Sequence, residues 1–133
     1  MFNLPAKYAQ EMRAHARAEA PNECCGLIAG KKGEIKRLYR TANVEKSPIR
    51  YSLHPQELLN IINEIETQDG ELLGIYHSHT HSLAYPSATD VKLAFWPDSL
   101  YFIISLMEPE ATAIRTFRIV EGAVTEEEVK IGR

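Results

Sequence analysis

The spacing of apolar residues along the chain predicts helices in three places. In residues 5–20, apolar side chains recur at helical intervals, and Pro5 suits the first turn of such a helix. In residues 54–70, leucines and isoleucines form a second stripe, and the glycine at its end is a typical helix stop. A third, shorter helix is expected from Ser87 to about Trp96, because a proline follows it.

The remaining apolar runs have the lengths of strands. Some are continuous, as in a buried strand, and others alternate with polar residues, as in a half-exposed one. They predict strands over residues 25–29, 34–41, 50–53, 72–77, 100–107, 111–120 and 124–131. A turn at residues 31–33 makes the first two strands a hairpin. We therefore expect an α/β fold, a mixed sheet with helices packed on it, in a single domain spanning residues 1–133.

The composition is that of an ordinary globular protein. Of 133 residues, 44% are hydrophobic and 25% are charged, and the formal net charge is −3. The sequence contains no basic cluster typical of nucleic-acid binding, and no apolar run approaches the roughly 18 residues of a membrane span. Charged residues interrupt positions 1–20, unlike the apolar core of a secretory signal. We expect a cytoplasmic protein that binds neither nucleic acid nor membrane.

The cysteines are the neighbours Cys24 and Cys25, which cannot join two distant segments by disulfides. A reducing compartment fits this usage. We expect Cys25 to lie in the core and Cys24 to be partly buried, since free cysteine usually behaves as a small hydrophobe. A hydrolase that uses either thiol with a histidine is an alternative to the metal site considered next.

The segment His77-Ser78-His79 carries the chemistry that is most specific in this chain. Side chains two apart on a strand point to the same side, so both imidazoles can face one ion while Ser78 points away. Asp90 follows eleven residues after His79. Two nitrogens and one oxygen are the ligand set of a catalytic zinc site that keeps a fourth position open. Zinc is favoured, and iron, manganese and cobalt remain alternatives.

Ser87 and Asp90 also have a purely structural interpretation. Residues 87–90 have the form of a helix capping box, in which the serine caps the helix and the aspartate lies in its first turn. The two interpretations are compatible, because a first-turn aspartate is held rigidly. A general base is still required, and Glu23 is the best candidate because it immediately precedes the first buried strand. Its alternative interpretation is a solvated loop acid.

The other histidines receive no assigned role. His81 follows on the same alternating face, where it could ligate the metal, contact solvent or hold a substrate carboxylate, and we place it outside the ligand set. We expect His15 on a helix surface and His54 at the start of a helix.

The order Glu23, His77-Ser78-His79, Ser87 and Asp90 resembles the JAMM motif of MPN-domain zinc metallopeptidases. The spacing H-x-H-x7-S-x2-D matches without gaps, and the order of helices and strands fits an MPN domain over most of the chain. The chain departs from the usual pattern at Thr80, where proline commonly follows the second histidine, and at His81.

This resemblance implies a single MPN (JAMM) domain with a mixed, curved sheet flanked by helices. It implies that His77, His79 and Asp90 bind Zn²⁺, that Glu23 is the general base and that Ser87 hydrogen-bonds the developing oxyanion. The implied reaction is hydrolysis of a peptide or isopeptide bond at the C-terminal tail of a ubiquitin-like or sulfur-carrier protein. That tail would lie extended beside a strand edge and add to the sheet.

The rival from another functional class is a non-catalytic MPN-type scaffold that only binds partner proteins. Such a module needs neither a complete ligand set nor a base, so stoichiometric zinc would separate the two. The oligomeric state is open between monomer and homodimer.

Overall fold

The computed structural model describes residues 1–132, apart from the side chain of Ala111. The elements in chain order are β1 (Phe2–Leu4), α1 (Ala6–Glu19), β2 (Cys25–Lys31), β3 (Glu34–Thr41), α2 (Pro55–Thr67), β4 (Glu71–His79), α3 (Ala88–Lys92), β5 (Leu100–Ser105), the 3₁₀ turn η1 (Glu110–Thr112), β6 (Ile114–Val120), β7 (Ala123–Glu127) and β8 (Val129–Ile131). No helix in the described part of the chain is long and apolar enough to span a membrane.

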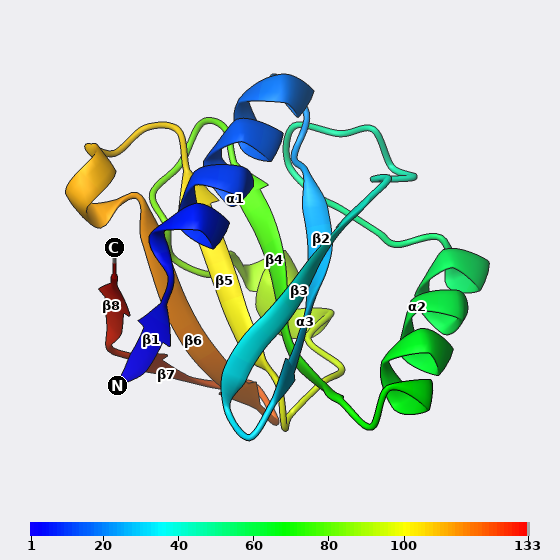
Figure 1. Cartoon of the computed structure of the whole chain (residues 1–133). Helices are drawn as coiled ribbons and strands as arrows, with labels where there is room; N and C mark the ends of the chain where they lie inside the picture. Colours follow the sequence, from blue (N-terminus) through cyan, green and yellow to red (C-terminus); the bar gives the residue numbers. More distant parts are fainter. Residues whose placement is uncertain (133) are drawn as a thin grey trace.

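Six strands form one mixed sheet in the order β3-β2-β4-β5-β6-β7 (Figure 1). All neighbours in this sheet are antiparallel except β4 and β5, which are parallel. The two short strands β1 and β8 form a separate parallel pair. The open edges of the large sheet are β3 and β7, so β4 lies in its interior with a neighbour on each side.

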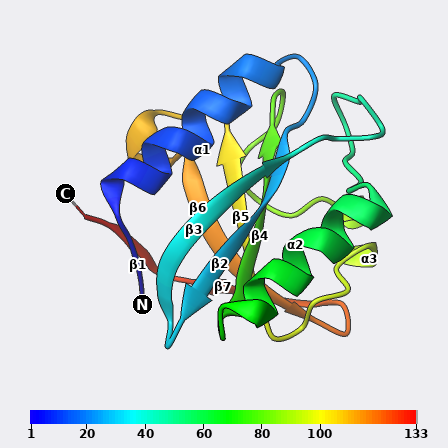
Figure 2. The ribbon, with the colours of Figure 1, turned by 45° about the vertical axis from the view of Figure 1, so that its right-hand side comes forward.

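Each face of the sheet carries its own hydrophobic core. On one face, α1 and β1 pack against alternate sheet residues such as Tyr76, Phe102 and Ile104. On the other face, Ile61 and Ile65 of α2 pack with the intervening sheet residues. In Figures 1 and 2 the β2–β3 hairpin runs between α1 and α2. Because side chains alternate along a strand, neighbouring residues of β4 such as Ile75 and Tyr76 face different cores.

The structure confirms the mixed sheet, the hairpin and both long helices. The expected strand over residues 50–53 is wrong: this segment makes an isolated bridge between Leu53 and Asn43 and is otherwise irregular. The short helix ends at Lys92 instead of near Trp96.

The last predicted strand, over residues 124–131, is divided in two at Glu128, whose carbonyl oxygen accepts a hydrogen bond from Phe2 N at 2.7 Å. β8 thereby leaves the large sheet and pairs with β1, a strand that the sequence pattern did not reveal.

Two burial predictions are also corrected. His15 is not on the surface: it is buried, and its Nδ1 lies 2.6 Å from the Tyr76 hydroxyl, so a core phenol supplies the polar partner that the ring requires. Cys24 is fully buried instead of partly so, because α1 packs over it. Cys25 lies in the core as expected.

The close pairing of β2 with β4 depends on Gly26. A Cβ at this position would overlap the Tyr76 ring and lie 2.5 Å from the Tyr39 carbonyl oxygen. Gly26→Ala should therefore lower the free energy of unfolding by roughly 2 kcal/mol or more, since overpacking a core typically costs 1–3 kcal/mol. Urea denaturation measures this loss. Gly132→Ala, with nothing within 4 Å of the added Cβ, is the control and should change stability little; equal stabilities of the two variants would contradict the prediction.

Candidate metal centre

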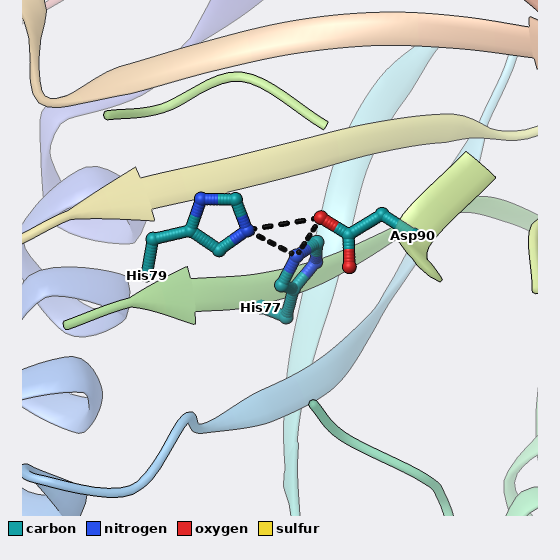
Figure 3. Close-up of side chains that lie close together, drawn as sticks. All are labelled: His77, His79 and Asp90. Carbon is teal, nitrogen blue, oxygen red and sulfur yellow. Dashed lines mark hydrogen bonds and ion pairs between the residues drawn. The ribbon is translucent and has the colours of Figure 1, made fainter. Parts of the chain in front are cut away.

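His77, His79 and Asp90 meet at the end of β4 (Figure 3). The two Nε2 atoms lie 3.1 Å apart, and Asp90 Oδ2 lies 3.1 Å from His77 Nε2 and 2.9 Å from His79 Nε2. All three side chains are buried. The sequence-predicted ligand set is thus brought together on one side of the sheet, while the Ser78 hydroxyl on the other side accepts a hydrogen bond from Cys24 N.

Asp90 is aimed by the first turn of α3. Its Oδ2 accepts a hydrogen bond from Ser87 N at 2.9 Å, and its own backbone N–H donates to Ser87 Oγ at 3.0 Å. The reciprocal pair is a capping box. The capping interpretation of these residues is therefore correct, and the same contacts direct the carboxylate toward the histidines.

The hydrogen bonds of His79 favour a cation at this point. Its Nδ1 lies 2.7 Å from the carbonyl oxygen of Leu83, which can only accept, so Nδ1 carries the proton. Neutral His79 then presents an Nε2 lone pair to the Asp90 carboxylate. Two electron-rich atoms at 2.9 Å need a positive charge beside them, which a proton or a metal ion supplies.

Burial and close contacts shift the pKa values of all three side chains in the cluster. Burial acts to raise the pKa of Asp90, but its close contacts with the His77 and His79 rings outweigh burial and hold that pKa well below its usual range. Burial lowers the pKa of His77, which keeps its ring neutral and its nitrogen free to ligate. Burial acts to lower the pKa of His79 as well, but its contacts with Asp90 and Leu83 O outweigh burial and raise that pKa, so the positive charge beside the carboxylate can be a proton on this ring or a metal ion.

The separations of the donor atoms suit one small ion. Two nitrogens about 2.0–2.1 Å from a tetrahedral zinc are roughly 3.3 Å apart. The three donor pairs here are separated by 2.9–3.1 Å. The residues present therefore fit a zinc ion with only small adjustments.

Glu23 lies on the same face of the sheet as the two histidines. Cys25 faces His77 in the β2–β4 ladder, and Ser78 N donates to Cys24 O, so the same register places Glu23 opposite His79. Its side chain is buried, and Oε1 has no hydrogen-bond partner among the described residues. Burial raises the pKa of Glu23 to about 8. Glu23 is therefore a desolvated carboxyl and not a solvated loop acid.

Tyr51 is a member of the site that the sequence pattern did not indicate. Its ring stacks on His77 with centroids 4.5 Å apart and an interplanar angle of 21°. It also forms one wall of an apolar pocket of about 230 Å³ that includes Trp96. Residues 50–53 resemble a strand in sequence, and nothing in that pattern shows that the ring packs on a histidine.

The remaining histidines stay outside the cluster. His81 is exposed, and its Nδ1 lies 2.9 Å from Thr80 Oγ1. His54 caps α2 by accepting a hydrogen bond from Gln56 N, as expected for the start of a helix.

Residues 5–120 match the family model described as prokaryotic homologs of the JAB domain. The chain belongs to this family. Among JAB-domain relatives, a CysO-cysteine peptidase of Mycobacterium tuberculosis is 44% identical over 130 residues, which is 96% of this chain and 89% of the relative. A desampylase of Haloferax volcanii is 36% identical over 111 residues, 78% of this chain and 80% of the relative.

Solved structures with a similar fold agree with this family assignment. A protein from Desulfitobacterium hafniense has a TM-score of 0.87 at 38% identity, covering 99% of this chain and 93% of its own. A JAB1/MPN domain protein from Archaeoglobus fulgidus has a TM-score of 0.67 at 16% identity, covering 100% of each chain, and this likeness shows the fold. The expected MPN-type α/β fold is confirmed.

We predict that the purified protein binds about one zinc ion per chain and that His77→Ala removes it, because the variant lacks one of the three donors. Elemental analysis after dialysis measures the metal directly, without reference to activity. His54→Ala is the control, since His54 is exposed and caps α2. Full zinc occupancy in His77→Ala would remove His77 from the ligand set.

Both cysteines should be inert in the folded protein. Burial raises the pKa of Cys24 to about 12 and the pKa of Cys25 to about 11. At about pH 8, no more than roughly one thiol in a thousand is then the reactive thiolate. Iodoacetamide should leave the intact mass unchanged under native conditions and add two labels in urea. Rapid native labelling that also stops turnover would favour the thiol mechanism instead.

Proposed function

We propose that the protein is a zinc-dependent peptidase or isopeptidase that hydrolyses a bond at the C-terminal tail of a ubiquitin-like or sulfur-carrier protein. The observation that carries this proposal is the buried His77, His79 and Asp90 cluster with the desolvated Glu23 carboxyl on the same face of the sheet. The peptidase and desampylase relatives support the reaction class and the kind of substrate.

In this proposal His77, His79 and Asp90 hold the zinc ion. When bound, zinc acts as a Lewis acid and lowers the pKa of an attached water to roughly 7. The protein's own part is to direct an Nε2 lone pair of each ring toward the ion, and Leu83 O does this for His79 by holding the ring proton at Nδ1.

Glu23 moves the proton. Its carboxylate accepts a proton from the attacking water and later delivers it to the leaving amine. Burial raises the pKa of Glu23 to about 8 in the metal-free site, and the charge of a bound zinc ion would lower it toward neutral pH, where the group can both accept and release a proton. The lack of a partner at Oε1 among the described residues leaves that oxygen available for the transfer.

Ser87 is the proposed donor to the tetrahedral oxyanion. Its Oγ already accepts a hydrogen bond from Asp90 N, and a hydroxyl that accepts one bond still has its proton to donate. The side chain is exposed, so a substrate carbonyl can approach it. One such donor contributes on the order of 3 kcal/mol to transition-state stabilisation.

The two alternatives receive less support. A scaffold that only binds proteins has no need of a buried carboxylate facing two buried imidazoles, an arrangement that is unfavourable unless a cation is present. A thiol route requires an accessible thiolate, whereas burial raises the pKa of both cysteines.

The proposed substrate tail approaches the carboxyl end of β4. This strand is interior, so strand addition would use the edges at β3 or β7 or the irregular segments beside the site. The pocket walled by Tyr51 can accept an apolar side chain of the partner. We propose that the enzyme acts in the cytoplasm as a monomer or homodimer, without nucleic acid or membrane.

Glu23→Gln should keep zinc and lose turnover by about 10²–10⁴-fold, the usual contribution of a general base. The test substrate is a sulfur-carrier protein with one amino acid attached at its C-terminus, and intact mass follows its release. Glu45→Gln, which changes an exposed acid, should turn over like the unchanged protein. Equal turnover by Glu23→Gln would remove Glu23 from the mechanism, and a wild-type protein that cleaves no ubiquitin-like or sulfur-carrier protein would refute the proposed function.

A further inference from the structure

Asn43 is a buried polar residue whose amide is fully hydrogen-bonded, just beyond the end of β3. Its Nδ2 donates to the carbonyl oxygens of Glu23 and Arg50, both at 3.0 Å. Its Oδ1 accepts from the backbone N–H groups of Glu45 at 3.0 Å and Ser52 at 3.1 Å. Two donors and two acceptor positions are the full capacity of a carboxamide.

The first of these bonds holds the residue that we propose as the base. Glu23 lies outside β2, which begins at Cys25, so the strand ladder does not fix it. Instead Glu23 N donates to Ser47 O at 2.9 Å, and Glu23 O accepts from Asn43. Both backbone hydrogen-bonding groups of Glu23 are thus bound to the segment 43–52.

The register of the sheet places Asn43 beside Glu23. Cys25 faces Thr41 in the β2–β3 ladder. Extending this register by two residues places Glu23 opposite Asn43, on the same side of the sheet. On the opposite flank, the β2–β4 register places His79 beside Glu23. Glu23 therefore lies between β4, which carries His77 and His79, and Asn43, which anchors the segment 43–52.

Two of the other bonds of the same amide hold Tyr51. They engage Arg50 O and Ser52 N, the backbone groups on either side of this residue. The Tyr51 ring in turn stacks on His77. One carboxamide thus connects the backbone of the candidate base with the aromatic ring that covers a candidate metal ligand.

We propose that Asn43 is a positioning residue for hydrolysis, whose amide sets the place of the Glu23 carboxyl relative to the zinc ligands. This inference rests on the proposed function. All four hydrogen bonds of the Asn43 amide are to backbone groups, and its effect on hydrolysis passes through the backbone of Glu23. Aspartate has the same shape but lacks the two donors, and alanine lacks both donors and acceptors.

The principal experiment compares Asn43→Asp with Asn63→Asp in the full-length, zinc-loaded protein. Asn63 is exposed on α2, so its variant makes the same charge change away from the site. A misplacement of about 1 Å can cost roughly 10²-fold in rate. We expect Asn43→Asp to retain one zinc per chain, to lower kcat at least about tenfold and to change KM little, whereas Asn63→Asp should match the wild type.

A double-mutant cycle tests whether the effect passes through Glu23. Glu23→Asp keeps a carboxylate but shortens its reach, so residual turnover can be measured. If Asn43 acts by placing this carboxyl, the loss in kcat caused by Asn43→Asp should be several-fold smaller in the Glu23→Asp background. Independent losses that multiply would overturn the inference, because a general structural role predicts that result.

Asn43→Ala repeats the test without introducing a buried charge. If both Asn43 variants fail to give folded, zinc-loaded protein, the residue serves folding and the inference is wrong. If Asn43→Asp turns over at the wild-type rate while Glu23→Gln is inactive, the positioning role alone fails. If Glu23→Gln keeps full turnover, the proposed mechanism fails first.

Discussion

In the antiparallel ladder between β2 and β4, Cys25 faces His77 and Gly26 faces Tyr76. This pairing brings the proposed base and the candidate metal ligands together. Its register, extended two residues beyond the Cys25–His77 pair, places Glu23 beside His79. Gly26 permits the pairing by leaving room for the Tyr76 ring. A backbone contact in the core thus determines a distance in the site, and a substitution that separates the two strands would also displace the base from the ligands.

The site concentrates polar groups where the fold otherwise buries apolar ones. His77 Nδ1 and Glu23 Oε1 are buried without a hydrogen-bond partner among the described residues. Each such group typically costs about 1–3 kcal/mol, so the two together weigh against a net stability of only about 5–15 kcal/mol. The cost is tolerable because both cores and the capping box hold the surrounding backbone. Polar atoms that are buried without a hydrogen-bond partner remain available to a metal ion, a water molecule or a transferred proton.

The sequence predicted those parts of the molecule that depend on local periodicity. The H-x-H spacing placed His77 and His79 on one side of a strand, and the S-x-x-D signature predicted the capping box that aims Asp90. The role of the segment 43–52 could not be predicted in this way, because Asn43 works through single hydrogen bonds to backbone atoms that are distant along the chain. Strand β1 was missed for a related reason. It has three residues, and its partner β8 lies at the far end of the chain.

Side chains alternate between the two faces of the sheet along β4, so the residues that anchor the strand and the residues of the candidate metal centre lie on opposite faces. Tyr76 and Ser78 point to the face covered by α1, where the phenol meets His15 and the Ser78 hydroxyl meets Cys24 N. His77 and His79 point to the other face, toward Asp90. A register slip of one residue would exchange the two sets, and the Tyr76 contacts on the α1 face oppose such a slip. Tyr76 and Ser78, which alternate with the two histidines along β4, therefore fix the position of the strand from which the donor atoms of the metal centre project.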